Sequence, residues 1–473
     1  MGVRPRQLSV RTLLTGILLC LSDCRPAHLT RVHEALLGLD DQQRHRLGVE
    51  VDWKGRAHTL TYRQTERTFG LVIDALAKSE PDGEPTEILQ WVTDALLEAS
   101  IEASQKHHEA QAVDWTDVES FCCRRTNRGR YSDPEASWGH RKGGGPGEKD
   151  DQFFGYYLQL STMVKREGGQ DVAELVRRML LTSCHVDPPP AFAKVLIAMV
   201  HSGIALGEVI FDSGYAHRVA EHWALPLRLT GADLVMDLHP HDRGTKGTHQ
   251  GAICFNGNLY CPATPTPLFD LEPLSRRASK DETAAHDRRA AELARYKLGR
   301  ITADDPDGYH RVGCPAVFRK VRCPLKEASM ALSAERPEIL SPPEHPPACC
   351  VQKTLTVPPQ VNAKTAQKHD YPSADHRHSY ARRTAVERAN ANIKDPATND
   401  ISRGWCRMMG LAPMSLMLAC VLVVRNIRVS DAFSERQADN RRRQAAGLAP
   451  RTRRRRRKTL TDLVGQATAD APP

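Results

Sequence analysis

The chain has 473 residues, of which 40% are hydrophobic and 26% charged, and its formal net charge is +9. This composition excludes a wholly disordered chain and leaves room for a catalytic core with one or two smaller modules. The excess of positive charge suits a protein that meets phosphate backbones. The 13 cysteines are scattered and odd in number, which excludes a secreted disulfide framework and favours reduced thiols in the cytoplasm.

Two apolar stretches resemble membrane signals. Residues 13–21 follow three arginines, as in a signal peptide, but no small-residue cleavage site comes after them. Residues 411–424 are too short and interrupted to span a bilayer, so we expect a buried core helix there. The sequence therefore predicts a cytoplasmic protein with no membrane partner.

The first 105 residues are expected to form a helical domain. Apolar residues recur at helical spacing in 8–21 and 28–39, and further helices are expected at 62–77 and 85–103. Such a domain is compatible with a small DNA-binding module of the helix-turn-helix type. Any compact helical domain shares this pattern.

From Gln111 onward the pattern indicates an α/β core. Strands are expected at 112–118, 153–164, 208–211 and 232–238. Helices are expected at 171–182, 191–203 and 216–223, and the Gly-rich stretch 129–151 is expected to be a loop. Asp114 lies on the first strand, with Asp117 as its nearest competitor for a functional role. Asp212 ends the third strand, where functional groups gather in open α/β sheets.

A cluster of polar side chains shares one face of an expected helix near the C-terminal end. Offsets of +3, +7 and +14 fall within one narrow sector at 3.6 residues per turn. The residues with these offsets are Tyr380, Arg383, Glu387 and Lys394. The opposite face, expected to pack on a sheet, carries Val386, Ala389 and Ile393. The polar face can hold a metal through its carboxylate and a phosphate through its cations and phenol. A solvated charged face is the common alternative for any one of these residues.

This spacing resembles the Y-(2)-R-(3)-E-(6)-K signature of a large group of bacterial DDE insertion-sequence transposases. The resemblance extends from the N-terminus to about Phe433. It implies that Glu387 is the third member of an Asp-Asp-Glu metal triad, with Asp114 and Asp212 as the first two. It also implies two Mg²⁺ ions, for which Mn²⁺ would substitute. Tyr380, Arg383 and Lys394 would bind DNA phosphates.

The order of the strands and of the Glu387 helix resembles the RNase H-like fold, interrupted by a β-rich insertion. The expected parts are a helical domain (1–105), the core (106–239 and 372–433), the insertion (240–371) and a basic tail (434–473). Within the insertion, Asn256-Gly257 predicts a hairpin and residues 279–298 a helix. The tail is expected to be disordered and either to bind DNA nonspecifically or only to aid solubility.

Six cysteines of the insertion leave a zinc site open as an alternative to ordinary buried thiols. Their spacings lack the close C-x2-C pairs typical of zinc sites, so buried thiols are favoured. These cysteines are Cys254, Cys261, Cys314, Cys323, Cys349 and Cys350.

The resemblance implies a transposase that cuts transposon ends and joins them to target DNA. Its partner would be double-stranded DNA, and pairing two ends implies a homodimer in the active complex. Two other functional hypotheses stay open. One is a noncatalytic, transposase-derived DNA-binding protein or repressor, and the other is a nuclease that cleaves without joining.

Overall fold

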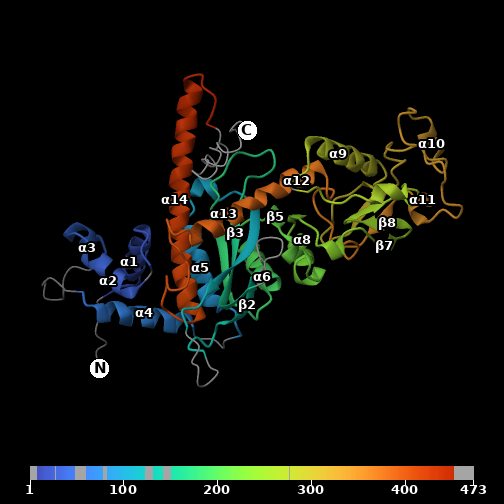
Figure 1. The fold of residues 1–473 in the computed structure, drawn as a ribbon. Helices are drawn as coiled ribbons and strands as arrows, with labels where there is room; N and C mark the ends of the chain where they lie inside the picture. The colour runs from blue at the N-terminus through green and yellow to red at the C-terminus, as the bar shows by residue number, and fades with distance from the viewer. Residues whose placement is uncertain are drawn as a thin grey trace, which may run out of the picture. The chain divides into compact units, whose positions relative to one another are not determined.

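The computed structural model describes residues 8–26, 28–47, 60–77, 82–122, 131–141, 151–275 and 277–451 (Figure 1). By its internal contacts the chain divides into two compact units, Met1–Ile427 and Arg428–Pro473. The first unit contains every predicted site residue.

The N-terminal part is helical, as the sequence predicts. Its elements are α1 (Val10–Ser22), α2 (Leu29–Leu37), α3 (Asp41–Leu47), α4 (Tyr62–Leu76), α5 (Glu87–Ala99) and the short η1 (Ala103–Gln105). α1, α2 and α4 bury apolar side chains against one another, among them Ile17, Val32 and Phe69. Gly16 permits the close approach of α1 to α2, because a Cβ there would lie 2.8 Å from Leu36 Cγ. DNA binding by these helices stays a prediction.

A six-stranded sheet forms the centre of the first unit. Its strands are β1 (Ala110–Glu119), β2 (Ser137–Arg141), β3 (Asp151–Met163), β4 (Val176–Ser183), β5 (Glu208–Phe211) and β6 (Asp233–Met236). They lie in the order β2-β3-β1-β5-β6, and β4 also pairs with β3. β1 is antiparallel to β3 and parallel to β5, which is parallel to β6. The structure is therefore a mixed α/β fold.

Helices cover both faces of this sheet (Figure 1). Successive side chains of a strand point to opposite faces, so Ala112 and Val113 of β1 belong to different apolar clusters. One face packs against α5, α13 (Thr384–Lys394) and α14 (Leu411–Ala445). The other face packs against α6 (Pro188–His201), α7 (Ser213–Ala216) and α8 (Ala224–Leu229). The 3-10 turn η2 (Ala220–His222) lies between α7 and α8 in the sequence. α12 (Ala374–Tyr380) and η5 (Ala381–Arg383) lead directly into α13.

The start of α14 is a core helix, as expected. By length and composition α14 could cross a membrane, but 83% of its most apolar stretch is buried inside the protein. Asn426 fixes α14 to β4, because its Oδ1 accepts from Val176 N–H at 2.8 Å and its Nδ2 donates to Val176 O at 2.7 Å. These two bonds satisfy both backbone groups of one buried strand residue.

The insertion after β6 is rich in short strands. One sheet contains β7 (Thr245–His249), β8 (Ala252–Phe255) and β9 (Asn258–Tyr260), and the other contains β10 (Gly299–Arg300), β11 (His310–Gly313) and β12 (Leu355–Val357). The helical elements are η3 (Pro240–Asp242), η4 (Thr266–Phe269), α9 (Lys280–Arg295), α10 (Glu327–Met330) and α11 (Ala348–Val351). The predicted hairpin is confirmed, with φ of 44° at Asn256 and 84° at Gly257.

Four sequence predictions are wrong in part. Residues 176–183 form a strand rather than the expected helix, because they pair along β3. The loop expected at 129–151 contains β2, which also pairs with β3. The single helix expected at 216–223 is replaced by η2, with α7 ending before it and α8 beginning after it. Residues 434–445 of the expected disordered tail are helical, while 452–473 lie outside the described residues.

Candidate active site

Asp114 is held in the middle of the sheet, on the face that packs against α13. It lies two residues after Ala112, so the period-two alternation of β1 gives both side chains the same face. Its Oδ1 accepts from Trp115 N–H at 3.0 Å, and Asn390 Nδ2 of α13 lies 3.5 Å from its Oδ2. The side chain is 17% exposed. Asp114 is therefore a mostly buried carboxylate opposite the predicted catalytic helix.

Asp212 lies at the carboxyl end of β5, next to β1 in the sheet. It caps α7, since its Oδ1 accepts from Gly214 N–H at 2.9 Å. A glycine is needed at 214 because a Cβ would lie 2.5 Å from the Trp115 ring. The sharp turn that the sequence predicts after Asp212 thus also lets the indole pack beside it.

Glu387 projects from the first turn of α13, and the opposite face of this helix is buried as predicted. Val386, Ala389 and Ile393 are each 0% exposed and belong to the apolar cluster under the sheet. Glu387 is more open than the two aspartates, with a side chain 45% exposed. The apolar face therefore docks α13 on the sheet and leaves the glutamate free to contact Arg383.

Arg383 joins the three carboxylates. Its Nη2 donates to Glu387 Oε1 at 2.5 Å. Its Nη1 lies 3.4 Å from Asp114 Oδ2 and 3.9 Å from Asp212 Oδ2. The structure thus brings Asp114, Asp212, Glu387 and Arg383 together from four separate elements, as the sequence predicts for the three acids.

One guanidinium leaves the charge of three carboxylates incompletely balanced. Burial, together with the charges of Asp212 and Glu387, raises the pKa of Asp114 to about 7, although the charge of Arg383 and the hydrogen bond from Trp115 N–H lower it. Arg383 Nη1 is buried and has no hydrogen-bond partner among the described residues. The site can therefore accept a divalent cation at its carboxylates and an anionic oxygen at Arg383.

The ring of Tyr380 lies beside the guanidinium of Arg383 rather than beside the three carboxylates. Its ring lies parallel to that of His376, with centroids 5.7 Å apart, and the guanidinium of Arg383 is 5.9 Å from its centroid. His376 Nε2 donates to Met236 O at 2.8 Å, which fixes α12 to the end of β6. Burial raises the pKa of Tyr380 well above its usual range, so it remains a neutral phenol.

Lys394 is directed elsewhere. Its Nζ lies 2.8 Å from Asp117 Oδ1, and Arg141 Nη2 donates to Asp117 Oδ2 at 2.7 Å. Burial raises the pKa of Asp117, but the hydrogen bonds from Lys394 and Arg141 lower it below the usual value overall. Lys394 and Arg141 therefore balance the charge of Asp117. Asp117 does not belong to the carboxylate group formed by Asp114, Asp212 and Glu387.

The residue that anchors η5 is not predicted from the sequence. Arg382 pairs with a carboxylate outside the group of Asp114, Asp212 and Glu387: its Nη1 donates to Glu208 Oε2 at 2.6 Å. Glu208 begins β5 and is only 3% exposed, and it also contacts Lys368. This pair fixes the turn that carries Arg383. The adjacent arginines in the sequence were the available signal.

A second group with metal-ligand chemistry lies near the ends of β5 and β6. Ligand atoms of His217, His239 and Asp242 lie within 4.8 Å of one another, and within the described ranges no other three such side chains are this close. Asp242 Oδ1 accepts from Lys364 at 2.9 Å, while its Oδ2 is 3.5 Å from His217 Nδ1. The motif His239-Pro240-His241-Asp242 was the signal for this group in the sequence.

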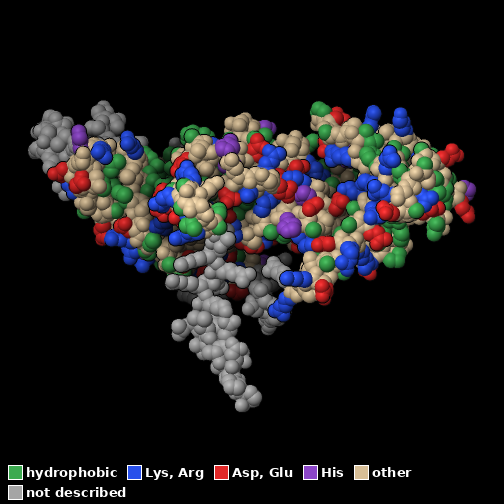
Figure 2. Space-filling model, turned by 90° about the horizontal axis from the view of Figure 1, so that it is seen from above, with side chains coloured by type: hydrophobic (Ala, Val, Ile, Leu, Met, Phe, Trp, Pro, Cys, Tyr) green, Lys and Arg blue, Asp and Glu red, His purple; other side chains and the backbone are tan. Residues whose placement is uncertain are grey.

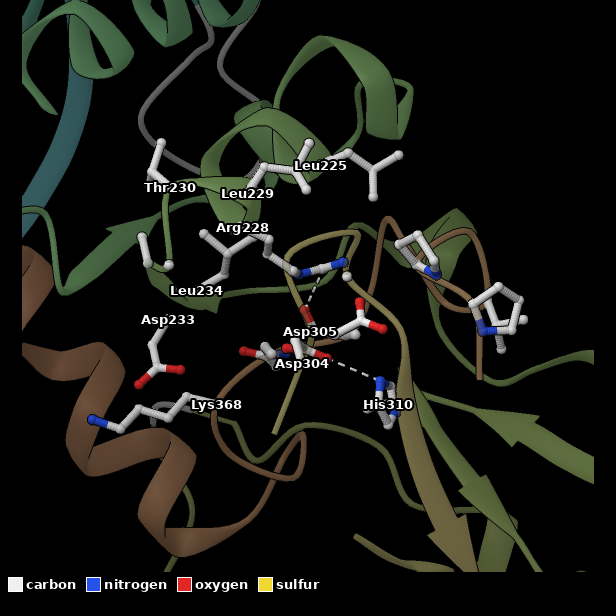
Figure 3. Close-up of a pocket in the computed structure, with 18 of the residues that line it drawn as sticks. Leu225, Arg228, Leu229, Thr230, Asp233, Leu234, Asp304, Asp305, His310 and Lys368 are labelled. Carbon is white, nitrogen blue, oxygen red and sulfur yellow. Dashed lines mark hydrogen bonds and ion pairs between the residues drawn. The ribbon is translucent and has the colours of Figure 1, made fainter. Parts of the chain in front are cut away.

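One surface pocket lies outside the carboxylate group, next to the insertion. A pocket of 670 Å³ is lined by α8, β6 and segments of the insertion, and Arg228 extends across it toward Asp304 and Asp305 (Figure 3). None of the predicted site residues lines this pocket. On the face in Figure 2, basic and acidic side chains of the described residues are interspersed. From Arg428 onward the sequence has twelve Lys and Arg against five Asp and Glu, so most of the net positive charge lies there.

Comparisons with known proteins give little beyond this geometry. A scan against protein-family models finds no match, and a search of curated proteins finds none. Among solved structures, the chain is similar to a chain of the Drosophila P element transposase strand transfer complex, at 9% identity and a TM-score of 0.27. The alignment covers 90% of this chain and 93% of the other.

Proposed function

We propose that this chain is a DDE-type DNA transposase that cuts transposon ends and joins them to target DNA. The observation that carries the proposal is the convergence of Asp114, Asp212 and Glu387 on Arg383. The three carboxylates are far apart in the sequence. A solvated charged face of one helix therefore does not explain why all three lie around the same guanidinium.

The sheet supports this proposal. The antiparallel strands β1, β3 and β4 are followed by the parallel strands β5 and β6, with β1 and β5 adjacent. This is the arrangement expected of an RNase H-like core, in which acids on two neighbouring strands and a following helix face one another. The insertion separates β6 from α13 in the sequence, as proposed for this core.

The donor set fits hard divalent cations. Three carboxylates offer only oxygen ligands, which suit Mg²⁺ or Mn²⁺. Asp114, Asp212 and Glu387 would hold two such ions, and when bound they would activate the attacking oxygen and neutralise charge on the leaving oxygen. Burial raises the pKa of Asp114 to about 7 even though Arg383 lies beside it, so a bound cation would favour the charged form of this carboxyl.

The remaining residues would position the DNA. Arg383 Nη1, buried and lacking a hydrogen-bond partner in the described structure, would donate to a phosphate oxygen. Tyr380 would hold the guanidinium in place through its ring. Lys394 would reach DNA only by leaving Asp117, so we assign it first to the support of β1 and second to phosphate binding.

The test uses the full chain and a duplex with the two DNA segments that flank its gene. We expect Mg²⁺-dependent cleavage and joining, abolished by Glu387→Gln while DNA binding is retained. Asp117→Asn is the matched control, because it removes a carboxylate three residues from Asp114 that does not join the group. Cleavage without joining would indicate the nuclease, and binding without cleavage the repressor. Joining by Glu387→Gln would refute the triad.

Pairing of two ends would require two copies of the chain in the active complex. The measurement is the mass of the complex on paired ends, by light scattering. A single copy bound across both ends would contradict the expected homodimer.

A further inference from the structure

Two histidines and an aspartate meet where the chain leaves β5 and β6. His217 caps the C-terminal end of α7, which follows β5, and His239 and Asp242 belong to the turn η3, which follows β6. β5 and β6 are neighbouring parallel strands, so the segments after them leave the sheet at the same edge. One ligand atom from each of the three side chains lies within 4.8 Å of the other two. In the described part of the chain, no three cysteines come this close.

The backbone of η3 places two of the three side chains together. Pro240 fixes the start of this 3-10 turn, and Asp242 N–H donates to His239 O at 2.8 Å. In a 3-10 turn, side chains three residues apart lie on the same side. His239 and Asp242 therefore share one side of a local turn, and only His217 has to be brought to them by the fold.

The aspartate is held by one oxygen and presents the other to the group. Lys364 Nζ donates to Asp242 Oδ1 at 2.9 Å. Asp242 Oδ2 is buried and has no hydrogen-bond partner among the described residues. His217 Nδ1 lies 3.5 Å from this oxygen, which is longer than an ordinary N–H···O hydrogen bond. A buried carboxylate oxygen without a donor is costly, and a bound cation would remove this cost.

The two imidazoles lie close enough to bind the same ion. Their ring centroids are 3.9 Å apart, with an angle of 32° between the rings. Two protonated rings at this distance would repel each other, whereas two neutral rings can both donate lone pairs to one metal. His239 Nδ1 accepts from His241 N–H at 3.3 Å, so it carries a lone pair. The side chain of His217 is 46% exposed, so its ring can turn toward an ion without displacing the core.

We propose that His217, His239 and Asp242 bind one zinc ion, with water in the fourth position. Two imidazoles and one carboxylate suit zinc, whereas Mg²⁺ prefers oxygen ligands. Zinc sites with three protein ligands keep the fourth tetrahedral position for water or substrate. Lys364 would act as an outer partner that orients the carboxylate. This site would therefore prefer a different metal from the group of three carboxylates.

The ion would join two segments that follow different strands. α7 begins after Asp212, whose Oδ1 accepts from Gly214 N–H, and it ends at His217. Zinc would tie the far end of this short helix to the turn after β6. Without a metal, the same side chains form only an ion-pair network in which Lys364 and a protonated His217 share Asp242. Zinc binding distinguishes these two arrangements.

The experiment measures zinc bound by the full chain, purified without a histidine tag and dialysed against zinc in excess Mg²⁺. The Mg²⁺ competes for sites that offer only oxygen. We expect about one zinc per chain at this site. His217→Ala and Asp242→Asn should each weaken its binding by at least about 100-fold, because loss of an outer partner alone costs about 10–100-fold. The matched control is His222→Ala, which removes an exposed histidine of the adjacent turn η2 and should leave zinc binding unchanged.

A second measurement identifies the ligand atoms without any substitution. Cobalt in place of zinc should give the visible absorption of tetrahedral nitrogen and oxygen ligation, without the intense band of thiolate ligation. Absence of bound zinc from the folded wild type would overturn the proposal, as would equally tight binding by His217→Ala. Cobalt bound only through thiolates would also overturn it. None of these outcomes depends on DNA cleavage, so the zinc site and the proposed function can fail separately.

Discussion

Removal of the charge at Asp114 is expected to stabilise the protein when no divalent cation is present. Asp114→Asn keeps the shape of the side chain and makes it neutral. The folded protein raises the pKa of Asp114 to about 7, from an ordinary value of 3.8. Over this range the folded state holds a proton that the unfolded chain has lost. The contribution of Asp114 to stability therefore falls as pH rises from about 4 to 7.

The shift sets the size of the effect. About three pKa units at about 1.4 kcal/mol each give an upper limit near 4 kcal/mol for the cost of ionising Asp114 in the fold. The side chain is 17% exposed, so solvent screening reduces the cost only in part. We expect Asp114→Asn to raise the free energy of unfolding by about 2–4 kcal/mol at pH 8. At pH 5 the gain should fall to about 1–2 kcal/mol, because the wild-type carboxyl is protonated in the folded state but already ionised in the unfolded chain.

The assay is urea denaturation at both pH values, without added Mg²⁺ and without a chelator. Asp117→Asn is the control with the opposite sign. Its pKa is lowered by Lys394 and Arg141, so loss of its charge should reduce stability at pH 8. Mg²⁺ should stabilise the wild type more at pH 8 than at pH 5. At pH 8, Mg²⁺ should stabilise the Asp114→Asn variant less than it stabilises the wild type. Equal or lower stability of Asp114→Asn at pH 8 would refute the reasoning.

Three other substitutions test the same framework. Arg383→Gln removes the cation between three carboxylates and should lower the free energy of unfolding by about 2 kcal/mol without Mg²⁺. Added Mg²⁺ should recover part of this loss. No recovery would count against metal binding. Asn426→Ala leaves both backbone groups of Val176 without their partner and should cost about 1–3 kcal/mol by urea denaturation. Gly155→Ala places a Cβ 2.1 Å from Val118 O and should cost at least about 1–3 kcal/mol; unchanged stability would mean that β3 does not lie against β1 as described.

The sequence predicts the elements whose pattern is local. The strand before Asp212 and the apolar face of α13 carry their own periodicity, and both predictions are confirmed. The segment 176–183 does not carry such a pattern. Its two arginines are buried because Glu98, far away in the sequence, pairs with both. In the sequence, a strand that carries buried charged residues has the same mixed polar and apolar pattern as an amphipathic helix. The two cannot be told apart until the residue that pairs with those charges is known.

The same limit applies to the site. The spacing of Glu387 and Lys394 on one helix suggests one shared role, yet the structure gives them different partners. Glu387 meets Arg383, whereas Lys394 meets Asp117 on β1. The phosphate-binding role predicted for Arg383 stays a prediction. Its contact with three acids depends on how β1, β5 and α13 pack, which no local pattern encodes.

The position of α13 and α14 late in the chain has a consequence for synthesis on the ribosome. These helices cover the apolar face of β1 and β3, but they are made only after the whole insertion. A nascent chain therefore exposes that face for the time needed to translate more than a hundred residues, which invites aggregation or chaperone binding. It also lacks Arg383 and Glu387 throughout, so a partly made chain cannot assemble the carboxylate group. The topology therefore completes the carboxylate group only when the core closes.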